Sequence, residues 1–263
     1  MNSKSESNHA FSNEIKKMFN RKGKIILLSV ILLTTIYWIL AKWYTNKSGY
    51  SKDLVVFYAL FQPIFGNTPW LDYWQYIYQF VLTMVLFFLV PFLIVRFFFK
   101  EDFKAYGLGG GNKKLGLILV GIFIPILFVV SIYASQDPIM QAEYPLTKLM
   151  GANWFAYIFF EAMYFFYFYA YEVMMRGYLQ FGLKRNKNSI RGIIVILAIQ
   201  TSITTIYHIG KPISEITLAL VMGPVLGYAA LKLDSIWYGM ILHFFINLFN
   251  DWFILYWLNM LPA

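Results

Sequence analysis

Long apolar segments alternate with short polar ones over almost the whole chain. The seven long apolar segments lie near residues 25–41, 73–95, 115–133, 153–181, 190–208, 215–231 and 236–258. Each reaches the roughly 17–25 residues that an α-helix needs to cross a bilayer. An eighth segment, 54–65, is shorter and contains Pro63, which is typical of an interfacial or re-entrant helix or of half a broken span. The pattern predicts an all-α, polytopic membrane protein with seven or eight transmembrane helices.

Composition and charge support this class and exclude others. Hydrophobic residues make up 59% of the 263 residues and charged ones 13%, which argues against a soluble domain. Of the 22 Lys and Arg residues, sixteen lie in the N-terminal tail and in alternate loops on the same side of the predicted spans. This bias predicts a cytoplasmic N-terminus and, with seven spans, an external C-terminus. The net charge of +9 thus reflects topology, and no nucleic-acid partner is expected.

The predicted organisation is simple. Residues 1–24 form a polar, basic cytoplasmic tail, and 25–263 form a single multi-spanning membrane domain. The glycines of 100–114 indicate a connector rather than a phosphate-binding loop, because no Gly-Lys-Ser/Thr follows them. The chain has no cysteine, which excludes disulfides, thiolate catalysis and cysteine-bound zinc.

One apolar segment contains an apparent ion pair. Only Glu161, Glu172 and Arg176 carry charge between Trp154 and Phe181. Ionisable side chains inside a membrane are costly and are usually paired and functional. Glu172 and Arg176 stand four residues apart, on one helix face. The pair is either a structural link between helices or a general base, Glu172, that Arg176 keeps ionised and oriented. Glu161 is expected to be a solvated residue near the outer interface.

Two histidines lie in later apolar segments with polar partners at helical spacing. His208 ends a stripe with Gln200 and Thr204, and His243 precedes Asn247 by four residues. Such residues can join helices by hydrogen bonds. They can also act on a water and on an oxyanion, and their clustering with Glu172 favours this second interpretation.

A metal site is the alternative for one glutamate and two histidines. Zinc could be held by Glu172, His208 and His243, but the chain has no His-Glu-x-x-His spacing. Arg176 also competes for the Glu172 carboxylate and repels a cation. A metal-free site without a cofactor is therefore the expectation.

These three blocks, in this order, resemble the CPBP family of intramembrane endopeptidases, the type II CAAX prenyl protease and bacteriocin-processing (Abi-like) group. The resemblance covers about 150–250. The family pattern is Glu-Glu-x-x-x-Arg, then Phe-x-x-x-His, then His-x-x-x-Asn or Asp, and the second and third blocks end here at His208 and Asn247. Two positions depart from it: Tyr171 stands where the family has its first glutamate, and Thr204 stands where it has phenylalanine.

The resemblance implies roles for these residues. His208 handles the attacking water, His243 and Asn247 form the oxyanion hole, and Glu172 and Arg176 support the site. In the family, the first glutamate activates the water together with the histidine of the second block, whereas a phenol with a pKa near 10 is a poor base at neutral pH. With Tyr171 at this position, either Glu172 assumes the base role, or the site is slow, or the protein keeps the fold for another purpose.

Three functions follow as hypotheses. The leading one is an intramembrane endopeptidase that acts on a membrane-embedded or lipid-anchored peptide or protein in a bacterial cytoplasmic membrane. The alternative is a catalytically weakened or inactive relative that binds a membrane peptide or protein as an immunity or scaffold component. A transporter with Glu172 as proton relay is third, and no inverted repeat supports it.

Overall fold

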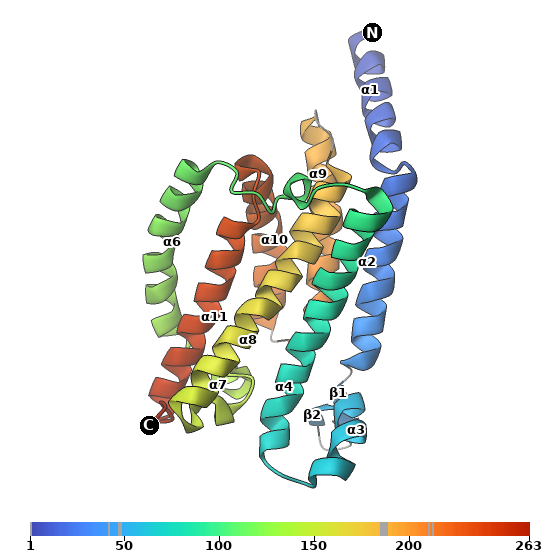
Figure 1. Ribbon diagram of the computed structural model, residues 1–263. Helices are drawn as coiled ribbons and strands as arrows, with labels where there is room; N and C mark the ends of the chain where they lie inside the picture. Colours follow the sequence, from blue (N-terminus) through green and yellow to red (C-terminus); the bar gives the residue numbers. More distant parts are fainter. Residues whose placement is uncertain (1, 42, 47–48, 185–188, 210, 212) are drawn as a thin grey trace. The chain divides into compact units, whose positions relative to one another are not determined.

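Helices account for almost all of the structure. The computed structural model describes residues 2–41, 43–46, 49–184, 189–209, 211 and 213–263 (Figure 1). The α-helices are α1 (Asn2–Met18), α2 (Arg21–Leu40), α3 (Val55–Phe65), α4 (Trp70–Thr83), α5 (Val90–Leu93), α6 (Lys113–Ala134), α7 (Pro138–Glu143), α8 (Trp154–Glu172), α9 (Ile190–Tyr207), α10 (Ile213–Leu233) and α11 (Trp237–Trp257). Three π-helical segments are η1 (Met84–Leu89), η2 (Ile94–Phe99) and η5 (Val173–Phe181), and two 3₁₀ segments are η3 (Phe103–Tyr106) and η4 (Lys148–Ala152).

The predicted all-α, polytopic membrane architecture is confirmed. Among the described residues, six helices are long and apolar enough to cross a membrane: Arg21–Leu40, Trp70–Phe99, Lys113–Ala134, Ile190–Tyr207, Ile213–Leu233 and Trp237–Trp257. A seventh long helix joins the 19 residues of α8 to the nine of η5. Five tyrosines and two glutamates lower the hydropathy of α8, although its length suits a span. The predicted count of seven or eight is consistent with this set.

Two regions outside the spans have structure that the hydrophobic pattern did not predict. The polar tail is helical over Asn2–Met18, and the buried Met18 side chain anchors the end of α1. Strands β1 (Trp43–Asn46) and β2 (Gly49–Leu54) form an antiparallel pair ahead of α3. The short apolar segment predicted at 54–65 is α3, whose 11 residues are too few to span a bilayer.

The chain folds into two compact units whose segments alternate along the sequence. Unit 1 comprises Met1–Ile31, Pro91–Leu117 and Glu172–Gly239, and unit 2 comprises Leu32–Val90, Ile118–Tyr171 and Met240–Ala263. The boundary between Tyr171 and Glu172 falls inside the continuous helix of α8 and η5. That residues 25–263 act as a single domain stays a prediction.

Unit 1 is built around η5, whose nine residues are all buried. This segment packs against α9 and α10. On its other sides, the Tyr178 hydroxyl lies 2.8 Å from that of Ser29 on α2, and the ring of Tyr178 stacks on Tyr106. The loop after η3 is held because the indole nitrogen of Trp237 donates to the Leu108 carbonyl at 2.9 Å.

The core of unit 2 is aromatic, which accounts for the run of Phe and Tyr in α8. Phe80 of α4 stacks on Tyr164 of α8 with ring centroids 4.9 Å apart. The Tyr73 hydroxyl donates to the Ala156 carbonyl at 2.8 Å. On α11, Phe244 meets Phe165 edge-on at 5.2 Å. Aromatic pairs in stacked and edge-on arrangements add to the stabilisation from burial.

Candidate active site

The predicted first block lies where α8 changes from α-helical to π-helical backbone. Glu172 is the last residue of α8, and Arg176 lies in η5. A π-helix makes i→i+5 hydrogen bonds, is rare, and is frequent at functional sites. Both side chains are inside unit 1, where the nine η5 residues are buried.

Glu172 and Arg176 form the predicted ion pair. The Nη1 atom of Arg176 contacts the Oε2 atom of Glu172, and the two side chains are 3% and 0% exposed, respectively. The arginine Nε has no hydrogen-bond partner among the described residues. Both groups are thus shielded from bulk water, and each charge compensates the other. The arrangement can hold a carboxylate ionised and oriented in an apolar environment.

Tyr171 packs against His243 in unit 2. The Tyr171 side chain is 3% exposed, and its ring meets the His243 imidazole at 78° with centroids 6.0 Å apart. Phe168, almost one turn earlier on α8, lies 4.6 Å from the same imidazole. The residue that replaces the family's first glutamate therefore helps to orient a histidine of the third block.

Asn247 follows His243 on α11, as the spacing predicted. Its side-chain nitrogen donates to the His243 carbonyl at 2.8 Å. An amide nitrogen carries two hydrogens, so this bond leaves the second for another acceptor. Both side chains are half-buried. The imidazole and the amide are donors of the kind that stabilise an oxyanion.

His208 lies at the end of α9, in the C-cap position. Its Nδ1 is 2.7 Å from the carbonyl oxygen of Thr204. Because a carbonyl only accepts, this contact assigns the hydrogen to Nδ1 and leaves Nε2 of the neutral ring as the acceptor. Thr204 also accepts from the Gln200 amide at 2.7 Å, which confirms that the predicted stripe is one connected group. An imidazole held in this tautomer can take a proton from water.

A second polar cluster in unit 1 was not predicted. The Gln180 side-chain nitrogen of η5 donates to the Gly227 carbonyl of α10 at 2.6 Å. Gly227 has no side chain, and the carboxamide oxygens of Gln180 and Gln200 lie close to the position that a Cβ would take at this residue. Neither oxygen has a hydrogen-bond partner among the described residues. The only signal in the sequence was an isolated glutamine near the end of an apolar segment.

The expectation for Glu161 was wrong. Its side chain is not solvated but 5% exposed, within the aromatic core of α4, α8 and α11. Neither carboxylate oxygen has a hydrogen-bond partner in the described part of the chain. The fully buried Asp251 of α11 interacts with it electrostatically. Aromatic side chains around this part of α8 cover the Glu161 carboxyl group. Its position in the sequence had suggested that this group lies near water.

The structure places the predicted residues in two groups. Glu172 and Arg176 are in contact in unit 1, which also contains His208, and Tyr171, His243 and Asn247 are linked in unit 2. Within the residues described, no three His, Asp or Glu side chains are grouped closely enough to hold a metal ion. The metal-free site stays a prediction.

Comparison with known proteins identifies the segment that contains both groups. Residues 151–249 match the family model described as type II CAAX prenyl endopeptidase Rce1-like. This segment is similar to Rce1-like domains. The match confirms the resemblance to the CPBP intramembrane proteases and agrees with the predicted extent of about 150–250. All six predicted site residues lie within the Rce1-like segment. No curated protein and no solved structure matches the chain.

Proposed function

We propose that this multi-pass membrane protein is an endopeptidase that hydrolyses a peptide bond in a membrane-embedded or lipid-anchored peptide or protein. The observation that carries the proposal is the buried Glu172–Arg176 ion pair inside the Rce1-like segment. An ionisable side chain inside a membrane segment is by default functional, and a guanidinium that orients Glu172 and favours its ionised form prepares it to act as a general base on a water that enters the site.

In the proposed mechanism, Glu172 and His208 together activate a water molecule. The Nε2 atom of His208 accepts the proton, as its Nδ1 contact with Thr204 allows. The water oxygen attacks the carbonyl carbon of the peptide bond. His243 and Asn247 then donate hydrogen bonds to the resulting oxyanion, and Arg176 keeps Glu172 charged and oriented. When the oxyanion collapses, the C–N bond breaks, and His208 returns the proton from its Nε2 atom to the leaving amine, which releases a carboxylate and an amine. No cofactor takes part.

We also propose the orientation and location. The sixteen Lys and Arg residues on one side of the spans favour a cytoplasmic N-terminus. A bacterial cytoplasmic membrane follows from the family resemblance. The substrate then approaches through the bilayer or carries a lipid, and the reaction takes place among helices rather than in bulk water.

Cleavage by purified protein in detergent tests the proposal. The probe is an internally quenched peptide that ends in a farnesylated Cys-aliphatic-aliphatic-X sequence. Glu172→Gln and His208→Ala are each expected to lower kcat at least 10²-fold, the usual contribution of a general base. His9→Ala, which removes an exposed histidine of α1, is the matched control and should retain full activity. Full activity in both site variants would exclude the mechanism.

Tyr171→Glu is the informative second arm of this assay. A phenol is protonated at neutral pH, so restoring a carboxylate at this position is expected to raise kcat roughly tenfold or more. An inactive native protein that becomes active as Tyr171→Glu would instead identify the chain as a binding component that keeps the protease fold.

A further inference from the structure

A pocket of about 580 Å³ lies in unit 1 between the start of α2 and the end of η2. Its lining combines the polar residues Asn20, Arg21, Lys22 and Glu101 with the apolar residues Ile25, Phe98 and Phe99. Its volume is in the range of small-molecule sites. A ligand that fills it therefore has both a polar and an apolar part.

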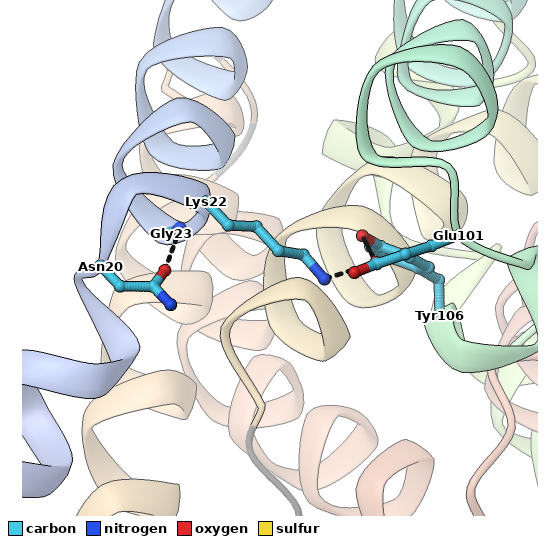
Figure 2. A network of polar contacts seen from close by, with 5 residues as sticks. All are labelled: Asn20, Lys22, Gly23, Glu101 and Tyr106. Carbon is cyan, nitrogen blue, oxygen red and sulfur yellow. Dashed lines mark hydrogen bonds and ion pairs between the residues drawn. The ribbon is translucent and has the colours of Figure 1, made fainter.

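The only acidic group of the pocket is already neutralised (Figure 2). The Lys22 ammonium donates to Glu101 Oε2 at 2.5 Å, and the Tyr106 hydroxyl donates to the same oxygen at 2.7 Å. The ammonium also lies 5.1 Å from the Tyr106 ring centroid and 5.5 Å from that of Phe99. These contacts fix Lys22 and compensate the charge of Glu101.

Arg21 supplies the remaining charge of the pocket. Its side chain is exposed and has no ion-pair partner among the described residues. A guanidinium presents a planar set of donors that matches two oxygens of a phosphate. The polar lining of the pocket thus favours an anion, and a phosphate in particular.

The pocket lies where two spans end. Arg21 begins the span Arg21–Leu40, and Phe99 ends the span Trp70–Phe99. Phe98 is 61% exposed, and Leu28, one turn beyond Ile25 on α2, is 66% exposed, which leaves an apolar path from the pocket along α2. The polar part of a ligand is therefore held at the membrane interface while its apolar part lies along a helix in the bilayer.

We propose that this pocket binds the phosphate headgroup of an anionic phospholipid. Arg21 contacts the phosphate, and Ile25 and Phe98 contact the first carbons of the acyl chains. Free phosphate would use the guanidinium but leave the apolar lining uncovered. A zwitterionic lipid would bring a second cation next to Arg21 and Lys22. The proposal is independent of the proposed proteolysis.

Two matched pairs of variants test the site in the full chain. Binding of dioleoylphosphatidylglycerol is measured by native mass spectrometry of protein released from micelles. Arg21→Gln is expected to weaken binding at least fivefold, whereas Lys24→Gln, which removes an exposed charge outside the pocket, should change it less than twofold. Phe98→Ala should weaken binding severalfold, and Phe97→Ala, also exposed but outside the pocket, should not.

The possible contrary results are distinct. Equal losses within both pairs would show non-specific attraction of the lipid, electrostatic for Arg21 and Lys24 and hydrophobic for Phe98 and Phe97, and would overturn the site. Equal binding of dioleoylphosphatidylcholine would exclude selection for an anion. Complete displacement of the lipid by millimolar inorganic phosphate would assign the pocket to free phosphate instead. Thermal unfolding of each variant identifies any variant that misfolds. If Arg21→Gln misfolds, the comparison of Phe98→Ala with Phe97→Ala decides whether the lipid binds in this pocket.

Discussion

Removing one partner of the Glu172–Arg176 ion pair is expected to cost more stability than removing both. The two side chains are 0% and 3% exposed, so a charge that loses its partner stays shielded from bulk water. Breaking such a buried pair costs about 3–5 kcal/mol, whereas replacing both members can be nearly neutral. For a chain of this size, that loss corresponds to roughly 5–9 °C in Tm. Glu172→Gln and Arg176→Met should each show this loss of stability. The double variant should be almost as stable as the native protein.

Thermal unfolding in detergent, followed by the fluorescence of the eight tryptophans, provides the measurement. The exposed Lys184–Asp234 pair, at 2.7 Å with side chains 34% and 68% exposed, is the control. Lys184→Met should change stability by less than about 1 kcal/mol. If the losses from the two single variants simply added in the double variant, to within about 0.5 kcal/mol, the two charges would not be coupled and the reasoning would be refuted.

Two further predictions concern packing and metal. In Gly227→Ala, the new Cβ would lie 2.9 and 3.0 Å from the carboxamide oxygens of Gln180 and Gln200. The free energy of unfolding should therefore fall by about 1–3 kcal/mol. The control is Gly121→Ala in α6, where a Cβ meets nothing within 4 Å and the change should be neutral or stabilising. Proteolysis should persist in EDTA and 1,10-phenanthroline, because Arg176 repels a cation at Glu172. If the purified protein bound one zinc ion per chain and His208→Ala did not, the metal-free site would be contradicted.

Helix positions followed closely from the hydrophobic pattern, but backbone type did not. The segment predicted at 190–208 is the helix Ile190–Tyr207, and that predicted at 115–133 is Lys113–Ala134. Polar residues at both ends limit these apolar runs, so their length is visible in the sequence. The π-helical hydrogen bonds of Val173–Phe181 are not, because a change from i→i+4 to i→i+5 bonding leaves no mark in composition.

Site residues were predictable where the contact is local. The Glu172–Arg176 pair follows from four-residue spacing and is confirmed. The contact of Gln180 with Gly227 joins residues 47 positions apart, and it depends on how η5 packs on α10. Glu161 was misplaced for the same reason: its burial is determined by α4 and α11, not by its distance from the end of α8.

The π-helical backbone of η5 also makes the chain sensitive to changes of length. Each residue of a helix turns the chain about the helix axis, so loss of a single residue between Arg176 and Gln180 would change the direction in which the later side chains point. Glu172 and Arg176 would keep their spacing, while Gln180 would turn away from Gly227. Deletion of one residue would thus break the Gln180–Gly227 contact and leave the Glu172–Arg176 pair in place. It would do so without replacing any residue of the two polar clusters.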